Sequence, residues 1–204
     1  MSENINRDLP DGATELSPDD LVGLIPDYID TREDLNQFEK LNIQSALSRL
    51  SKQKLTYPQI LTVDFCIQLH RNMFDKTWEW AGQFRRREVN IGNTPPHAIS
   101  TQVRNVLDNA VFWVENDIYS TDETCLRVHR DIVWIHPFPN GNGRHSRIFC
   151  DVLRKSLGSS FFNWGNSGGE LVSPDKHRAA YILALRRADI GEYDTLIKFA
   201  TGTQ

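Results

Sequence analysis

The sequence predicts an all-α fold, a helical bundle that carries one small β-hairpin. Apolar residues recur at three- and four-residue steps through most of the chain, which is the spacing of one helix face. Period-two alternation is weak and confined to residues 83–97. With 204 residues, of which 39% are hydrophobic and 25% charged, the chain has the size and composition of one ordinary globular domain.

Local start and stop signals divide the chain into helices. Thr31 begins a stretch with capping-box character, and Pro58 suits the first turn of the next helix. Residues 121–124 are the expected N-terminal cap of a helix that ends at the following prolines, and Gly158 closes the helix after it. The predicted helices cover residues 31–50, 58–74, 99–114, 126–135, 142–157, 174–188 and 193–199.

The N-terminal residues differ in composition from the rest of the chain. Residues 1–20 hold few apolar groups and many Asp, Glu, Asn and Pro residues, so we expect an extended arm there. Residues 21–29 are apolar, are interrupted by Gly23 and Pro26, and are expected to dock on the body. Residues 21–204 are predicted to form a single domain.

Residues 83–97 have no helical period and are predicted to form the β-hairpin. Gly92-Asn93 is the turn signal. A solvated connector is the alternative. The arginines at positions 85–87 are either a solvated charge run or include one that contacts phosphate.

A dense polar stretch at residues 136–147 lies between two apolar segments. It reads His-Pro-Phe-Pro-Asn-Gly-Asn-Gly-Arg-His-Ser-Arg. Gly141 and Gly143 permit positive φ and the close approach of a ligand. The helix that begins near Asn142 directs free N–H groups and the positive end of its dipole at this loop. The pattern indicates a site for a phosphate-bearing ligand.

Two arginines and a histidine complete this pattern. Arg144 and Arg147 lie one turn apart at a helix N-terminus, where the dipole disfavours cations unless an anion is bound. A di- or triphosphate satisfies both guanidinium groups. His136 stands beside that anion as a candidate general base, because an unperturbed imidazole is mostly neutral at pH 7. Phe138 is expected in the core, and His145 is expected on the exposed side of the helix.

The stretch 136–147 resembles the Fic motif, His-x-Phe-x-Asp/Glu-Gly-Asn-Gly-Arg-x-x-Arg. Every specified position matches except 140, where Asn replaces the acidic residue. The wider chain resembles a Fic subgroup found on mobile elements, the mobile mystery protein B subgroup. That resemblance rests on residues 23–26, on the 35–43 stretch with Glu39 and Asn42, and on the 78–85 stretch with its two tryptophans.

The resemblance to this Fic (Fido) family implies a Fic-type helical bundle with a hairpin flap and protein adenylyltransferase activity. AMP would pass from ATP to a Ser, Thr or Tyr hydroxyl of a target protein, with His136 as the general base. The implied nucleotide-binding residues are Gly141, Asn142, Gly143, Arg144 and Arg147. Asn140 would bind Mg²⁺ weakly, because its amide oxygen lacks the charge of a carboxylate. The flap would hold the target by strand addition through Val89, Asn90, Ile91 and Gly92.

Control of such an activity has two candidate sources. Many Fic proteins inhibit themselves with a helix bearing Ser/Thr-x-x-x-Glu-Gly/Asn, and this sequence contains no such pattern. Glu39, on the predicted 31–50 helix, is therefore the candidate regulatory residue, with Glu33 beside it and a structural role as the alternative. The other source is a separate, antitoxin-like inhibitory protein.

Two further functions stay open at this point. A Fic-fold module that binds nucleotide or a partner without turnover is favoured by Asn140 and disfavoured by the intact His136, Arg144 and Arg147. Transfer of the γ-phosphate, or of another phosphate-containing group, is the second. A kinase-like relative has Lys where this chain has Gly143-Arg144, which disfavours γ-phosphate transfer.

Composition excludes other classes. The net charge of −4 argues against a nucleic-acid partner, and no apolar run has the length of about 18 residues that a membrane span needs. The chain has three cysteines without CxxC spacing, and they are predicted to be buried, reduced thiols. With no visible signal peptide, a cytoplasmic location is expected.

Overall fold

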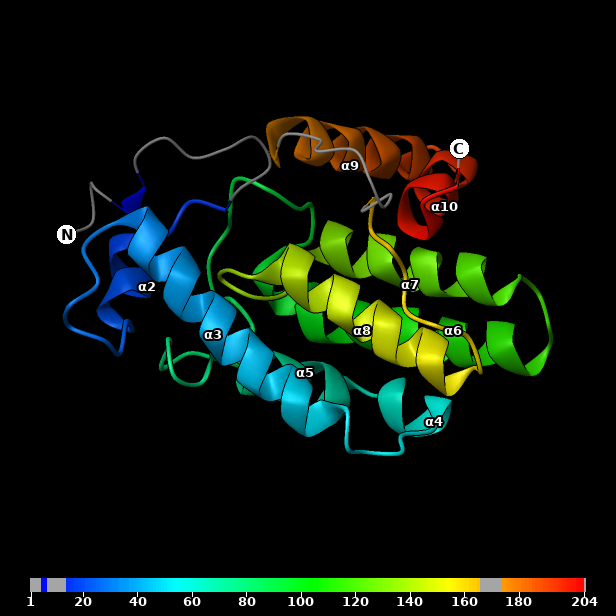
Figure 1. The fold of residues 1–204 in the computed structure, drawn as a ribbon, viewed down its shortest axis with the longest axis horizontal. Coiled ribbons are helices and arrows are strands. Elements are labelled where there is room, and N and C mark those ends of the chain that lie inside the picture. The colour runs from blue at the N-terminus through cyan, green and yellow to red at the C-terminus, as the bar shows by residue number, and fades with distance from the viewer. Residues whose placement is uncertain (1–4, 7–13, 166–173, 204) are drawn as a thin grey trace.

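The computed structural model describes residues 5–6, 14–165 and 174–203, and these residues form the helical bundle that the sequence predicts. The helices are α2 (Pro18–Val22), α3 (Arg32–Leu50), α4 (Tyr57–Ile60), α5 (Val63–Phe74), α6 (Ile99–Glu115), α7 (Thr121–Ile135), α8 (Asn142–Ser156), α9 (Pro174–Asp189) and α10 (Asp194–Thr201), with a short 3₁₀ turn at Pro96–Ala98. Figure 1 shows α7 and α8 as neighbours, joined by residues 136–141, which we call the polar loop.

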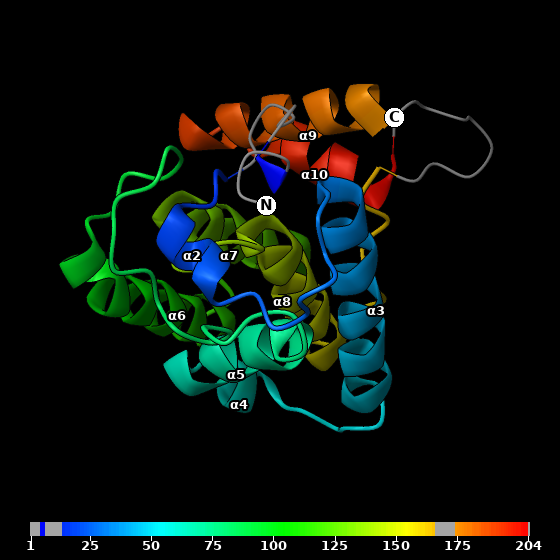
Figure 2. The ribbon, with the colours of Figure 1, turned by 90° about the vertical axis from the view of Figure 1, so that its left-hand side faces the viewer.

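The pair of helices α7 and α8 forms the centre of the bundle. Figure 2 shows α3, α5, α6, α9 and α10 arranged around this pair. The buried faces of α7 and α8 include Leu126, Ile132, Phe149 and Leu153, each fully buried. Because both helices are enclosed by apolar neighbours, the loop between them is held at a fixed place in the molecule.

Side-chain caps set most of the helix boundaries. Thr31 caps α3 through Asp34 N–H, as predicted. The predicted 58–74 helix is two helices, because the Thr62 hydroxyl accepts from Phe65 N–H and begins α5 separately from α4. Ser120 is the N-cap of α7, so this helix begins earlier than predicted.

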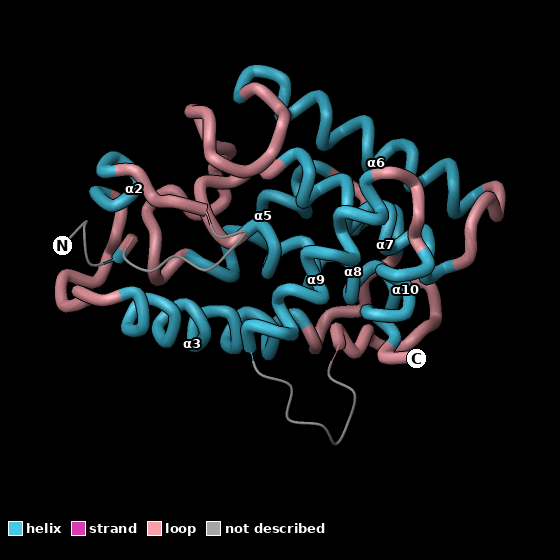
Figure 3. Tube along the Cα trace, turned by 90° about the horizontal axis from the view of Figure 1, so that it is seen from above, coloured by secondary structure: helices cyan, strands magenta, loops and turns pink. Residues whose placement is uncertain are grey.

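The predicted β-hairpin at 83–97 is not formed. Residues 83–95 are an irregular loop, which we call the flap loop, and Figure 3 shows it without strands. Its backbone bonds to the polar loop region instead of to itself: Arg85 N–H donates to Pro137 O at 2.9 Å and Asn93 N–H to Trp134 O at 3.4 Å. The weak alternation of apolar residues did not produce a hairpin, because these long-range hydrogen bonds take the place of the bonds between two strands.

The expectation of an extended arm at 1–20 is wrong for residues 14–20. Residues 1–4 and 7–13 lie outside the described residues, but Ser17 and Asp20 form a capping box that begins α2. Leu16 is 1% exposed, and Asp20 O accepts a hydrogen bond from Trp80 Nε1 at 2.9 Å. A single β-bridge also joins Leu24 to Trp78. Residues 14–24 are therefore a packed part of the domain.

Within the described residues, no helix combines the length and apolar character needed to cross a membrane.

Candidate active site

His136 is the residue at which α7 ends and the polar loop begins. Its backbone is left-handed (φ 53°, ψ 60°), and its N–H donates to Ile132 O at 3.0 Å. The residue is 5% exposed, and its Nδ1 lies 3.3 Å from Val133 O. Because a carbonyl oxygen only accepts, Nδ1 carries the proton of this bond and Nε2 keeps its lone pair. The imidazole is held in the tautomer that a general base needs.

The environment of His136 keeps its imidazole uncharged. Burial lowers the pKa of His136 to about 4, because the imidazolium form loses its hydration. The hydrogen bond to Val133 O opposes this shift, and the nearby Arg85 guanidinium adds to it. At neutral pH the ring is therefore able to accept a proton.

Arg85 fixes the end of α7. It is 3% exposed, and its Nε donates to His136 O at 2.7 Å while Nη2 donates to Ile135 O at 3.2 Å and to Thr94 O. A cation bonded to the last carbonyls of a helix is stabilised by the helix dipole. Arg85 thus joins the flap loop to His136 and is not a phosphate ligand or part of a solvated charge run.

The loop from 138 to 142 is closed by its own side chains. Phe138 is fully buried, as predicted, and the Asn142 amide accepts from Phe138 N–H at 2.9 Å and donates to Phe138 O at 2.8 Å. Both polar atoms of the Asn142 side chain are used, so its backbone N–H is the group that stays available to a ligand. Gly141 has φ 79°, and a Cβ there would lie 2.5 Å from the Phe74 ring. Gly143, in contrast, is an ordinary helical residue, and the expected positive φ is wrong there.

The N-terminus of α8 has the features of an anion site. No side chain of the described residues caps it, and the first intrahelical bond of this turn is from His145 N–H to Gly141 O. The N–H groups of the preceding residues therefore point outward. Arg144 and Arg147 lie near this end of α8. Arg147 Nε donates to Gly143 O at 3.1 Å, and its guanidinium lies 5.0 Å from the centre of the Tyr181 ring.

Glu39 from α3 reaches into this site. It is 1% exposed, its Oε2 lies 2.7 Å from Arg144 Nη2, and its Oε1 accepts from Trp78 Nε1 at 2.8 Å. The Asn140 Nδ2 also donates to Oε1, at 3.2 Å. The carboxylate of Glu39 therefore occupies a donor of Arg144 that a phosphate would otherwise use.

His70 holds the other side of Asn140, a role that the sequence did not reveal. Its Nε2 lies 3.0 Å from Asn140 O, its Nδ1 accepts from Gly82 N–H at 3.0 Å, and its ring stacks on Phe138 at 3.7 Å between centres. His145 is also fully buried, with Nε2 2.9 Å from Cys66 O, so the expectation of an exposed side chain is wrong. Both histidines position the loop.

Arg32 is a second residue that the sequence did not single out. Its Nη1 is buried without a hydrogen-bond partner among the described residues. Burial lowers its pKa; Glu39 opposes that shift, whereas Arg144 and Arg178 add to it. Arg32 on α3 is thus close enough to Glu39, to Arg144 of α8 and to Arg178 of α9 for each of them to shift its pKa. Such a concentration of guanidinium groups favours a multiply charged anion.

A hydroxyl from the N-terminal segment contacts His136. Thr14 Oγ1 lies 2.8 Å from His136 Nε2, although the two residues are 122 positions apart. The flap loop covers the same place: a Cβ at Gly92 would lie 2.7 Å from His136 Cβ. Val89 and Ile91 are half-buried and Asn90 is exposed. Of the predicted docking residues, the structure places Gly92 against His136 and Asn90 against Glu15, without the expected strand pairing.

The residues present are compatible with Mg²⁺ only when a nucleotide brings it. No group of three or more His, Cys, Asp or Glu side chains in the described ranges is arranged to hold a metal ion. Asn140 and Glu39 supply oxygen atoms beside the anion site. Mg²⁺ is typically bound by one or two protein oxygens together with substrate phosphates. The oxygen atoms of Asn140 and Glu39 fit a site of this kind, in which substrate phosphates supply the other ligands.

In this helical domain a neutral histidine lies beside a basic, uncapped helix N-terminus, an arrangement that can bind a phosphate-bearing ligand. Residues 60–153, just under half of the chain, match the Fic/DOC family. Assignment to the mobile mystery protein B subgroup stays a prediction.

Curated relatives and solved structures agree with this family. The protein adenylyltransferase fic-1 of Caenorhabditis elegans is 23% identical over 146 residues, covering 68% of this chain and 26% of that protein. The protein adenylyltransferase Fic of Nematostella vectensis is 25% identical over 128 residues, covering 61% of this chain and 30% of that protein. The chain thus spans less than a third of the length of these relatives.

The same fold occurs in solved Fic structures. Fic-1 of C. elegans superposes with a TM-score of 0.65 at 20% identity, covering 88% of this chain and 51% of that one. The BepC protein of Bartonella tribocorum, solved with bound AMPPNP, gives a TM-score of 0.63 at 17% identity, covering 86% of this chain and 88% of that one. These likenesses establish the Fic fold.

Proposed function

We propose that this protein is an adenylyltransferase that moves AMP from ATP to a Ser, Thr or Tyr hydroxyl of a protein. The observation that carries the proposal is the contact at His136 Nε2, which lies 2.8 Å from the hydroxyl oxygen of Thr14. The same imidazole is neutral and adjoins an uncapped, arginine-rich helix N-terminus. A base, a hydroxyl position and an anion site are the parts that nucleotidyl transfer requires.

His136 acts on the nucleophile in this mechanism. The hydroxyl proton passes to Nε2 as the oxygen attacks the α-phosphorus of ATP in line. The bond from the α-phosphorus to the bridging oxygen breaks, and pyrophosphate leaves. Nδ1 keeps its proton and donates it to the Val133 carbonyl oxygen throughout, which keeps the ring oriented.

The N-terminus of α8 acts on the phosphates. The outward N–H groups of its first turn bind α-phosphate oxygens, and Arg144 and Arg147 bind the β- and γ-phosphates. Arg144 must first exchange Glu39 for phosphate, because that carboxylate lies 2.7 Å from its Nη2. Mg²⁺, held by the phosphates with Asn140 as its protein ligand, would neutralise charge on the α- and β-phosphates.

Glu39 is proposed as the regulatory residue of this site. Its contact with Arg144 lowers the affinity for ATP, which sets a low basal activity. A separate antitoxin-like inhibitor stays a prediction from the family resemblance. A cytoplasmic location is likewise proposed, and the buried free thiols of Cys66, Cys125 and Cys150 support a reducing compartment.

Labelled ATP tests the proposal directly. The protein and a bacterial lysate are incubated with Mg²⁺ and ATP carrying ³²P at the α- or, separately, the γ-phosphate, beside His136→Ala. We expect label on protein from the α-position only, and none with His136→Ala. Label from the γ-position would establish kinase chemistry instead. Binding of ATP without label from either position would establish a binding module.

A further inference from the structure

Thr14 occupies the position that a target hydroxyl would take. Its Oγ1 lies 2.8 Å from His136 Nε2, and the two residues are 6% and 5% exposed. Since Nδ1 uses its proton on Val133 O, the hydroxyl is the donor and Nε2 the acceptor. This is the arrangement in which a base removes a proton from a nucleophile.

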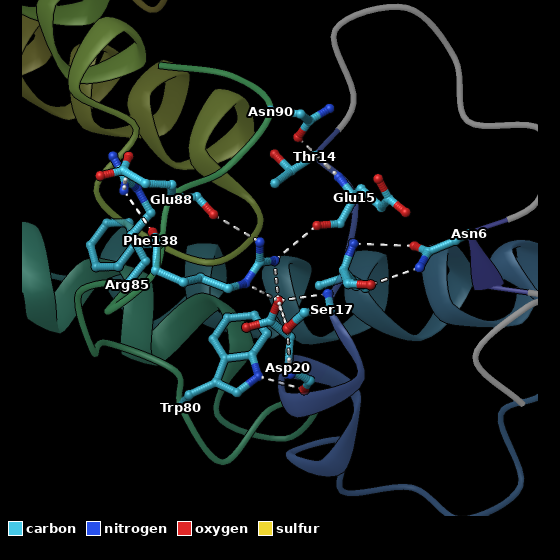
Figure 4. Close-up of polar contacts among 12 residues, drawn as sticks. Asn6, Thr14, Glu15, Ser17, Asp20, Trp80, Arg85, Glu88, Asn90 and Phe138 are labelled. Atoms are coloured by element: carbon cyan, nitrogen blue, oxygen red, sulfur yellow. Dashed lines mark hydrogen bonds and ion pairs between the residues drawn. The ribbon is translucent and has the colours of Figure 1, made fainter. Parts of the chain in front are cut away.

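The flap loop holds the segment that carries Thr14. Glu15 N–H donates to Asn90 Oδ1 at 3.3 Å, and Arg87 Nη2 donates to Glu15 O at 3.0 Å. Arg87 also forms an ion pair with Asp20. Figure 4 shows Thr14 and Glu15 beside Asn90, with Ser17 and Asp20 near Trp80. The loop predicted to hold a target therefore holds the chain's own residues 14–20, mostly through backbone groups.

A second set of contacts fixes the register of this segment. Leu16 N–H donates to Asn6 Oδ1 at 3.1 Å and Leu16 O accepts from Asn6 Nδ2 at 2.7 Å, while the Leu16 side chain is 1% exposed. With Leu16 buried and Asp20 paired, a shift by one residue would expose an apolar group and break an ion pair. The threonine is thus placed on His136 by anchors on its C-terminal side.

We propose that Thr14 is an AMP acceptor of this protein, modified within the same molecule. The proposal rests on the proposed function. Thr14 Oγ1 forms a bond to the α-phosphorus of ATP, the bond to the bridging oxygen of pyrophosphate breaks, and the hydroxyl proton passes to His136 Nε2. The products are a threonyl–AMP phosphodiester and pyrophosphate.

Modification changes what Thr14 does at the site. The ester oxygen has no proton, so it no longer donates to Nε2, and the bulky nucleotide does not fit a position that is 6% exposed. The segment is released and His136 becomes accessible to an external hydroxyl. Thr14 and external targets therefore compete for one lone pair.

The test uses the full chain with Mg²⁺ and α-³²P-labelled ATP, followed by peptide mass spectrometry. Four chains are compared: wild type, Thr14→Val, which keeps the shape without the hydroxyl, Thr14→Ser, and Thr101→Val as a matched control on the exposed face of α6. We expect AMP on the peptide containing Thr14 in wild type, Thr14→Ser and Thr101→Val, and at least a tenfold loss of self-labelling in Thr14→Val. Thr14→Val is also expected to label lysate proteins more than wild type.

Two comparisons separate this proposal from the proposed function. If lysate proteins are labelled but the Thr14 peptide carries no AMP, self-modification is wrong and adenylyl transfer stands. If neither is labelled although ATP binds, both fail. The fraction of Thr14 modified per unit time should not change on dilution, and wild type should not label Thr14 of added His136→Ala. Transfer to that variant would show modification between molecules and overturn the proposal.

Discussion

Glu39 and Asn140 form one electrostatic unit at the phosphate site. Glu39 accepts from Trp78 and Asn140 and is paired with Arg144. Glu39→Gln removes the charge and keeps the shape, so Arg144 is released for phosphate. A charge-assisted hydrogen bond contributes about 1.5–3 kcal/mol, and we expect ATP to bind roughly tenfold more tightly. Calorimetric titration of the variant with ATP measures this.

Glu33→Gln is the matched control, because Glu33 is an exposed carboxylate on the same helix. It should leave the affinity for ATP unchanged. Equal affinity of wild type and Glu39→Gln would show that the pair with Arg144 does not restrain nucleotide binding.

The amide at position 140 suits the carboxylate that faces it. Asn140 donates to Glu39 Oε1 at 3.2 Å, whereas an aspartate there would place two carboxylates in contact. We expect Asn140→Asp to lower the melting temperature by several degrees, and Asn140→Asp combined with Glu39→Gln to recover most of the loss. In a double-mutant cycle the coupling energy should be about 1 kcal/mol or more. Additive effects would contradict this reading.

At the scale of elements, the flap loop and the end of α7 are joined so closely that only glycine fits. Gly92 has φ 96°, and a Cβ would lie 2.7 Å from His136 Cβ and 3.1 Å from Trp134 O. We expect Gly92→Ala to displace His136 and to reduce adenylyl transfer by about tenfold or more, because small displacements of reacting groups are costly. The rate of label transfer from α-³²P-labelled ATP measures this.

Gly191→Ala separates backbone strain from the contact with His136. Gly191 has a similar φ of 88°, but a Cβ there meets nothing within 4 Å. Both substitutions should cost about 1 kcal/mol of stability from the left-handed backbone. Only Gly92→Ala should lose activity. Equal activity of the two variants would show that the contact at Gly92 does not position His136.

Local signals predicted the elements better than the contacts between them. The caps and apolar periods located α3, α6 and α8, and the dense polar stretch located His136, Arg144 and Arg147. The hairpin was wrong because the flap loop bonds to Pro137 and Trp134, and such distant partners leave no trace in a local pattern. The contact between Thr14 and His136 spans 122 positions, so sequence spacing alone did not indicate it.

On the scale of the whole molecule, the bundle is built on histidines that are buried in the neutral form. His70, His129 and His145 are fully buried and His136 is 5% exposed. Burial lowers the pKa of His129 to about 3 and the pKa of His136 and His145 to about 4, and it lowers the pKa of His70 in the same direction. These four rings support the site: His70 holds Asn140, and His129 contacts the Tyr181 hydroxyl at 3.0 Å.

This arrangement predicts that acid unfolds the domain above pH 4. The unfolded chain protonates these histidines near pH 6.5. In the folded chain the pKa is about 4 for His136 and His145 and about 3 for His129, and the pKa of His70 is lowered in the same direction. Between these values the unfolded state binds more protons, so the free energy of unfolding falls as pH falls. Each of His129, His136 and His145 contributes about 1.4 kcal/mol per pH unit between these values, so the three together remove a large part of a typical domain stability of about 5–15 kcal/mol within roughly two units.

Urea unfolding followed by tryptophan fluorescence between pH 7.5 and 4.5 measures this dependence. Burial raises the pKa of Asp131 and Asp151 above the ordinary value of 3.8, so their protonation opposes the loss mainly at the acidic end of the range. His129→Gln should flatten the slope, because one neutral buried ring is removed, whereas His97→Gln on the exposed 3₁₀ turn should not. A midpoint that stays constant from pH 6.5 to 5 would contradict the prediction, since it would require the buried rings to be protonated in the folded protein.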